Sequence, residues 1–322
     1  MTTALMPLGW RRTSRRFVTL ALLALAAPLS AQTPTEWLQR MDAAARQQNF
    51  VGTLVYGARG QMDTLRVFHR ATDDGDSERL LSLNGEPREM VRHGSTVLFT
   101  GNGSLPRAYV RGAATTPFAA NELQEALPHY RVIAAGEDRV AGLNTQVIDV
   151  RAGDAFRYSW RLWLEAESGL LLKSVRHGVD GIPVELMMFT DIELGAVPSD
   201  EQLKATVSTE PRQVDARPIE TASSAEARWD IADLPPGFKQ TLSERDAAQP
   251  NEEHLVFSDG LASVSVYISP VTAGDATPPV NIREGAVSVF SRQVDRFRVY
   301  VIGDVPELTV QRFAQGVSPR EG

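Results

Sequence analysis

The chain has 322 residues, and its 33 lysines and arginines against 40 aspartates and glutamates give a formal net charge of −7. This acidic balance argues against nucleic acid as a partner, because proteins that bind polyanions usually carry a basic surplus. The chain contains no cysteine, which excludes structural disulfides, thiol redox chemistry and cysteine-based zinc sites.

The first 31 residues have the layout of a secretion signal. Four arginines between residues 11 and 16 precede an uncharged apolar run over 17–29, and Ser30-Ala31 offers small residues to a signal peptidase. The run is about thirteen residues long, whereas a membrane span needs roughly twenty. We therefore expect cleavage near Ala31 and export to the periplasm. An uncleaved anchor is the alternative, and Sec and twin-arginine export both stay open.

The mature chain is predicted to open with a helix, because Trp37, Leu38 and Met41 begin an apolar stripe at helical spacing. The pattern then changes to alternation with a period of two, and Asn84-Gly85 predicts a tight turn. Residues 101–128 are less regular, with one short helical piece around 121–127, and are interpreted as a mobile flap. The predicted strands, roughly ten in number, include 50–56, 65–69, 79–83, 89–92, 96–100, 130–134, 145–151, 156–164, 170–176 and 184–192.

These strands are mostly joined by short turns, which predicts one large, strongly bent antiparallel sheet or an open barrel with the first helix against it. Residues 207–228 are rich in Ser, Thr, Ala, Pro and charge, so they are interpreted as a linker. A small α+β domain over 229–322 follows, with a hairpin over 255–269 and a closing helix over 306–315. The predicted organisation is therefore a signal peptide (1–31), a large domain (32–206), the linker and the small domain.

No catalytic motif with specific spacing is found in the sequence. The five histidines show neither an i, i+4 pair nor a His-Glu-x-x-His pattern, and no Gly-x-Ser-x-Gly elbow occurs. The acidic stretch 73–78 resembles the start of a calcium loop but lacks its sixth-position Gly and twelfth-position Glu in either register. We therefore expect no enzyme activity, no metal site and no cofactor.

Candidate binding residues come from the alternation of side chains along strands. Phe156, Tyr158, Trp160, Leu162 and Leu164 share one face, while the strand over 184–192 carries large apolar groups on both faces. One interpretation is core on one face and helix cover on the other. The second is an apolar groove between the sheet and the N-terminal helix, for which methionine is a suitable lining. The groove hypothesis names Trp37, Leu38, Met41, Leu54, Tyr56, Tyr158, Trp160 and Met188.

Several segments, spread in order along nearly the whole mature chain, together resemble one protein family. They are FVGTLVY at 50–56, ERLLSLNGEPRE at 78–89, WLE at 163–165, SGLLLK at 168–173, LPPGF at 234–238, SDGLASVSVY at 258–267 and VIGDVP at 301–306. With these segments the chain resembles the RseB/MucB family.

The resemblance implies a periplasmic negative regulator of an envelope-stress sigma factor. Such a protein binds the periplasmic region of a membrane anti-sigma factor and shields it from proteolysis. It also implies a large domain shaped as a half-open antiparallel β-barrel closed by helices, like the carriers LolA and LolB. Lipopolysaccharide, other acyl chains or misfolded envelope components would then be the signal that releases the partner.

Two other classes of function stay open at this point. The first is a periplasmic carrier that moves lipid or lipoprotein between membranes, and the second, with little in its favour, is a hydrolase. The residues do not locate the surface that binds the partner. They also leave the oligomeric state open, with a homodimer among the alternatives.

Overall fold

The computed structural model describes residues 32–58, 60–72, 75–94, 96–101, 123, 125–206, 212–215, 228–245, 251–271 and 278–320. The predicted signal peptide and most of the predicted flap lie outside the described residues. Contacts group Thr33–Gly322 into one unit, separate from the residues before it. Of the helices that are described, none has the length and apolar character needed to cross a membrane.

Helix α1 (Pro34–Gln47) begins at a capping box. The hydroxyl of Thr33 accepts a hydrogen bond from the backbone N–H of Glu36 at 3.3 Å, and the Glu36 carboxylate accepts one from the N–H of Thr33 at 2.6 Å. This exchange satisfies two N–H groups that the first turn leaves open, so it fixes where the helix starts. The predicted stripe is confirmed, since Leu38 and Met41 are fully buried.

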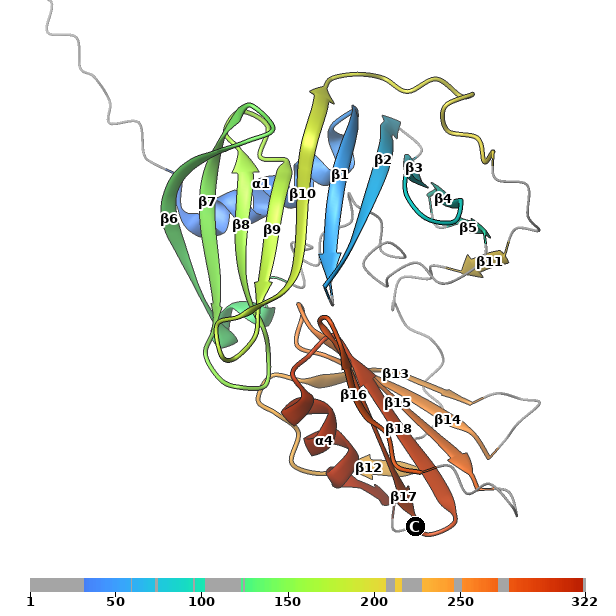
Figure 1. The fold of residues 1–322 in the computed structure, drawn as a ribbon. Helices are drawn as coiled ribbons and strands as arrows, with labels where there is room; N and C mark the ends of the chain where they lie inside the picture. Colours follow the sequence, from blue (N-terminus) through green and yellow to red (C-terminus); the bar gives the residue numbers. More distant parts are fainter. Residues whose placement is uncertain are drawn as a thin grey trace, which may run out of the picture. The chain divides into compact units, whose positions relative to one another are not determined.

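Within the described residues, eleven strands form one antiparallel sheet in the order β11-β5-β4-β3-β2-β1-β10-β9-β8-β7-β6 (Figure 1). Because β11 and β6 end this order, the sheet is open and the barrel is not closed. Helix α1 contacts β2, β3 and β6, so it crosses one face of the sheet, and the prediction of a large antiparallel sheet with the first helix against it is confirmed. The strands are β1 (Phe50–Ala58), β2 (Gln61–Thr72), β3 (Gly75–Ser82), β4 (Arg88–His93), β5 (Thr96–Gly101), β6 (Tyr130–Val140), β7 (Leu143–Ala152), β8 (Ser159–Glu165), β9 (Leu171–His177), β10 (Pro183–Leu194) and β11 (Arg212–Asp215).

Irregular pairing and one close approach mark the place where β1 meets β10. The register shifts between Thr53 and Leu54, and such bulges bend the bulged strand and raise its local twist. Nearby, a Cβ added to Gly52 would lie 2.8 Å from a ring carbon of Phe189 and 2.9 Å from the carbonyl oxygen of Asp191. Glycine therefore lets the two strands pack closely at this bend.

The two faces of β8 pack into different apolar clusters, as the alternation predicts. Trp160, Leu162 and Leu164 lie in the cluster that contains Leu38 and Met41 of α1. Trp163 lies in a second cluster, where its indole N–H donates to the carboxylate of Asp138 at 2.8 Å. On the face that α1 crosses, the apolar side chains of the sheet therefore form a core that the helix covers.

The C-terminal part contains a six-stranded antiparallel sheet in the order β13-β14-β15-β18-β17-β16. The hairpin and the closing helix that the sequence predicted are present. Phe313 of α4 packs edge-on against Phe238 and Phe257, with ring centroids 5.4 and 5.2 Å apart. The elements are β12 (Trp229–Ile231), which pairs with β19 (Val317–Pro319), then β13 (Lys239–Arg245), β14 (Glu253–Ser258), β15 (Ser263–Pro270), β16 (Asn281–Glu284), β17 (Val287–Val294), β18 (Phe297–Gly303) and α4 (Glu307–Gly316).

Two segments that the sequence treated as irregular contain regular structure. Strand β11 lies inside the predicted linker and pairs with β5, from Arg212 opposite Phe99 to Asp215 opposite Thr96. A short 3-10 helix, η1 (Leu127–His129), overlaps the end of the predicted flap, next to the helical piece predicted around 121–127, and leads into β6. The domain limits at 206 and 229 stay a prediction.

Candidate functional site

Four of the eight predicted groove residues meet beneath α1. Leu38 and Met41 are fully buried against Trp160, with Trp37 half-buried at the margin of the same cluster. The other members come from β6 to β9, from η1 and the residues before it, and from the β14–β15 turn: Leu123, Ala126, Leu127, Tyr130, Val132, Ile148, Val150, Ala152, Leu162, Leu164, Leu171 and Leu261. These side chains fill the space under the helix, so an acyl chain could enter only if α1 moved.

Leu54, Tyr56 and Met188 lie in the second cluster, but they do not share a face of the sheet. In the β1–β10 register Leu54 lies opposite Phe189, while Met188 lies opposite Val55. Residues directly opposite each other point to the same side, so Met188 points away from the side that Leu54 and Tyr56 occupy. The alternation within each strand was readable from the sequence, but the register between the strands was not.

A buried arginine lies among three of the predicted groove residues. The guanidinium carbon of Arg176 is 4.0 Å from the centre of the Trp160 ring and 6.0 Å from that of Tyr158. Tyr56 is close by, and its hydroxyl donates to the carboxylate of Glu185 at 2.9 Å. The predicted apolar groove therefore contains a cation that sequence reasoning missed, because Arg176 lies in an ordinary alternating strand.

The charge of Arg176 is only loosely compensated. Its side chain is 9% exposed, and its nitrogens lie 3.7 Å from Glu185 and 3.6 Å from Asp304. Burial opposes the charged form, yet these two carboxylates raise the pKa of Arg176, so the guanidinium stays protonated. Within the described residues its Nε has no hydrogen-bond partner.

Tyr158 also contacts the C-terminal part. Its hydroxyl donates to the carbonyl oxygen of Val305 at 3.1 Å, and burial raises the pKa of this phenol. Arg157, the next residue back, has a fully buried side chain that lies 2.9 Å from the carboxylate of Asp259. A buried ion pair of this kind is costly to break, because either partner alone would be left as an uncompensated charge.

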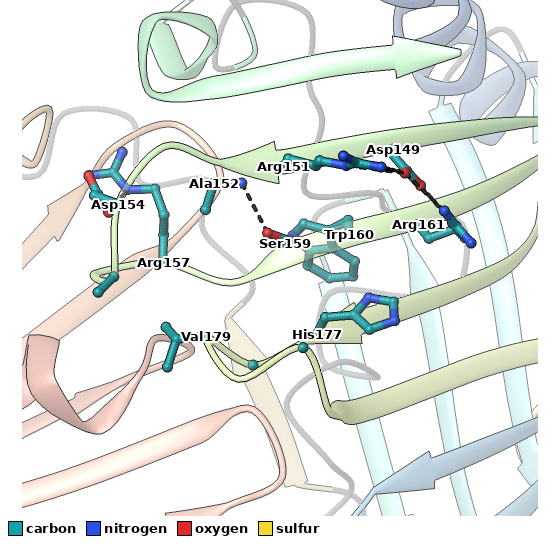
Figure 2. A pocket seen from close by; sticks show the side chains of 13 residues that line it. Asp149, Arg151, Ala152, Asp154, Arg157, Ser159, Trp160, Arg161, His177 and Val179 are labelled. Carbon is teal, nitrogen blue, oxygen red and sulfur yellow. Dashed lines mark hydrogen bonds and ion pairs between the residues drawn. The ribbon is translucent and has the colours of Figure 1, made fainter. Parts of the chain in front are cut away.

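A pocket of about 480 Å³ lies at the end of the sheet where β7 and β9 finish and β8 and β10 begin (Figure 2). Figure 2 shows Arg151 and Arg161 approaching Asp149 from opposite sides. Sequence reasoning missed this group, because Asp149 and Arg151 lie on β7 whereas Arg161 lies on β8. The lining residues are Asp149, Arg151, Ala152, Asp154, Ala155, Arg157, Ser159, Trp160, Arg161, His177, Gly178, Val179 and Gly181.

The protonation states in this pocket follow from the ion pairs. The hydrogen bond from Arg161 is the strongest influence on Asp149 and, with Arg151, lowers its pKa against the effect of burial. His177 behaves in the opposite way, because burial and then the charge of Arg161 lower its pKa, with Asp149 opposing them. At neutral pH this ion-paired group therefore presents the guanidinium groups of Arg151 and Arg161 and the carboxylate of Asp149, with a neutral imidazole at His177.

The described residues thus combine a helix-covered open sheet, buried apolar clusters and an arginine-lined pocket, an architecture that offers sites for binding. Comparison with known proteins gives the family. The model of the MucB/RseB N-terminal domain matches residues 33–207, and that of the MucB/RseB C-terminal domain matches residues 223–318. This chain belongs to the MucB/RseB family.

Individual relatives match along nearly their whole length. The sigma factor AlgU regulatory protein MucB of Pseudomonas aeruginosa is 33% identical over 321 residues, which covers 96% of this chain and 98% of that protein. The sigma-E factor regulatory protein RseB of Escherichia coli is 24% identical and covers 93% and 95%. MucB in the solved P. aeruginosa MucA/MucB complex superposes with a TM-score of 0.72 at 30% identity, covering 90% of this chain and 99% of that one.

Proposed function

We propose that this protein regulates a sigma factor by binding the periplasmic region of a membrane anti-sigma factor. The observation that carries the proposal is the similarity, over 90% of the chain, to MucB as it occurs in complex with MucA. A second structure, of MucB with the periplasmic part of MucA, matches with a TM-score of 0.70. The relatives at 33% and 24% identity are named regulators of sigma factors, which supports the same assignment.

The proposed role requires binding and no chemistry, and the protein is not proposed to be an enzyme. A bound regulator protects an extended partner segment from a protease by covering the backbone that the protease must reach. It works in the periplasm after residues 1–31 have been removed. The limits 32–206 for a large domain, 207–228 for a linker and 229–322 for a small domain are part of the proposal.

The large sheet with α1 across it is further proposed to work like the half-open barrel of lipoprotein carriers, as a receptor for acyl chains of lipopolysaccharide. Leu38, Met41 and Trp160 would line the space that α1 uncovers when it moves. Arg176 would meet an anionic headgroup there, because it is buried with ion-pair partners no nearer than 3.6 Å. Burying about ten methylenes contributes roughly 8 kcal/mol, against an association cost of about 4–15 kcal/mol, so several chains are needed for tight binding.

Lipid binding can release the partner only if the two ligands prefer different conformations. The contacts of Arg176 with Asp304 and of Tyr158 with Val305 are candidates for those that differ, since both join the groove residues to the C-terminal part. The alternative, a carrier that moves lipid or lipoprotein between membranes, is favoured by the same cluster under α1. A carrier needs no anti-sigma partner.

Protease protection separates the two roles. The purified periplasmic region of the anti-sigma factor from the same organism is digested with and without the mature protein, and then with added lipopolysaccharide fragments. The regulator predicts slower cleavage that lipopolysaccharide restores, whereas transfer of lipid between vesicles without any protection would establish the carrier. If lipopolysaccharide does not change the protection, the protein is still a regulator, but it does not respond to lipid.

A further inference from the structure

The arginine-lined pocket of Figure 2 contains charged side chains that are not part of the proposed groove. We propose that it binds a phosphate monoester through Arg151, Arg161 and the neighbouring Arg131, with His177 at its rim. The binding itself does not depend on the anti-sigma partner, while its regulatory meaning rests on the proposed function.

Asp149 orients two of the three arginines. Arg161 donates from Nε and Nη2 to the two oxygens of this carboxylate at 2.6 and 3.0 Å, and Arg151 donates from Nε and Nη2 to one of them at 3.3 and 2.8 Å. Each guanidinium thus uses one edge on Asp149. In the part of the chain that the structure describes, neither Nη1 has a hydrogen-bond partner. The outer edge of each planar fork is therefore held in place and remains open to a ligand.

Arg131 adds a charge where the fold alone would disfavour one. It lies directly opposite Arg151 in the β6–β7 register, which brings two like charges onto the same face of the sheet. Such pairs are destabilising, and no described residue forms an ion pair or hydrogen bond with the Arg131 side chain. An anion held between the two guanidinium groups would remove this repulsion. Local rules are often broken in this way at functional sites.

The pocket is accessible and of suitable size. The side chains of Arg151 and Arg161 are 58% and 44% exposed although their partner Asp149 is only 5% exposed. A volume of about 480 Å³ is in the range of small-molecule sites. At its edge, the β9–β10 turn presents the lining residue Val179 and its neighbour Ile182, which are 65% and 62% exposed. These side chains offer an apolar contact to whatever carries the phosphate.

The charge favours a phosphate monoester over a carboxylate. Among described residues, Arg131, Arg151 and Arg161 have one carboxylate partner between them, Asp149. The other lining arginine, Arg157, pairs with Asp154 and Asp259, so two positive charges are left uncompensated. A phosphate monoester carries between one and two negative charges at neutral pH and has three acceptor oxygens. It can therefore accept from several forks at once, whereas a carboxylate has only two oxygens.

Calorimetric titration of the mature protein with glycerol 3-phosphate tests the site. Replacing Arg131 by Gln should weaken binding about tenfold to a hundredfold, as the loss of a charged hydrogen bond does. It should leave the melting temperature unchanged or raised, because the like-charge pair is gone. The double variant R151Q/R161Q should abolish binding, while the matched control R139Q/R296Q, which removes two exposed arginines elsewhere, should not change it. No heat of binding with the wild type, or equal weakening by the control, would overturn the proposal.

Vesicle flotation identifies where the phosphate comes from. If the ligand is a lipid headgroup, vesicles with phosphatidic acid in phosphatidylcholine should bind the protein and pure phosphatidylcholine vesicles should not. The variant I182S, which changes a residue outside the pocket lining, should then weaken vesicle binding and leave glycerol 3-phosphate binding intact. Binding of glycerol 3-phosphate without any vesicle binding would assign the site to a soluble ester. If R151Q/R161Q binds vesicles as well as the wild type does, the pocket is not where the lipid headgroup binds.

Discussion

Replacing His69 by Gln tests the charge network at the end of α1. The ring of His69 is fully buried, with Nδ1 2.7 Å from the carbonyl oxygen of Gln48 and Nε2 3.1 Å from the carboxylate of Asp76. Both neighbours are acceptors, so both ring nitrogens must donate and the imidazole must be protonated. Arg92 donates to Asp76 at 2.6 Å and to Glu78 at 3.1 Å.

The stability that His69 contributes should fall as the pH rises. Burial alone would lower the pKa of His69, but the hydrogen bond to Asp76 and the charge of Glu78 outweigh it and raise the pKa above 6.5. Arg92 belongs to the same network and lies on β4, which pairs with β3, the strand that holds Asp76 and Glu78. A group whose pKa is raised on folding contributes stability fully below its unfolded pKa and loses it as the pH rises through the folded value. Protonated His69 should therefore stabilise the protein in mildly acidic solution.

The contacts of His69 set the free energy of unfolding that H69Q should lose. Gln at position 69 retains one neutral hydrogen bond but loses the charge beside Asp76, which costs about 2–3 kcal/mol for a buried charged hydrogen bond. At roughly 2–3 °C per kcal/mol for a chain of this size, the melting temperature should fall by about 4–9 °C. The matched control is H93Q on strand β4, because His93 is exposed and, among the residues that the structure describes, bonds only to the hydroxyl of Ser77.

Urea unfolding at about pH 6 and about pH 8.5 measures the effect, since this interval spans the titration of histidine. The wild type should lose stability between these two pH values, and H69Q should lose much less. H93Q should follow the wild type at both. If H69Q and H93Q are equally stable, or if H69Q keeps the full pH dependence, His69 is not the protonated link described here.

Two further substitutions test the packing of the large sheet by urea unfolding. Gly52→Ala should cost about 1–3 kcal/mol, because the added Cβ meets Phe189 at 2.8 Å, while Gly57→Ala on the same strand, with its nearest atom at 3.8 Å, should change stability by less than about 0.5 kcal/mol. Equal effects at the two glycines would contradict the close approach. Leu162→Ala should cost about 2–5 kcal/mol because its side chain is fully buried under α1, whereas exposed Val179→Ala should cost almost nothing. A small loss at Leu162 would mean that the space under the helix is already open.

Local features of the fold could be predicted from the sequence because their causes are local. The apolar stripe of α1 lies within one segment, and the helix predicted from it is present. Asn84-Gly85 predicted the turn between β3 and β4, and Gly85 adopts a positive φ of 73° there. The separate faces of Trp160 and Trp163 also followed, since alternation needs only the strand itself.

Contacts between strands could not be predicted in the same way. A shift of one residue in register moves a side chain to the opposite face, and the bulge at Leu54 decides that Met188 points away from Tyr56. Arg131 and Arg151 are twenty residues apart in sequence and meet only through the β6–β7 register. Strand β13 was missed for another reason, because this edge strand, Lys239–Arg245, is mostly polar and exposed and gives a weak alternating signal.

Titration of the mature protein with the periplasmic region of the anti-sigma factor from the same organism tests the claim that this protein binds it. We expect saturable binding with a dissociation constant at or below about 1 µM, equivalent to about −8 kcal/mol. An unrelated periplasmic peptide of similar length and charge should not bind. Absence of binding by a folded mature protein, or equal binding of the unrelated peptide, would contradict the claim.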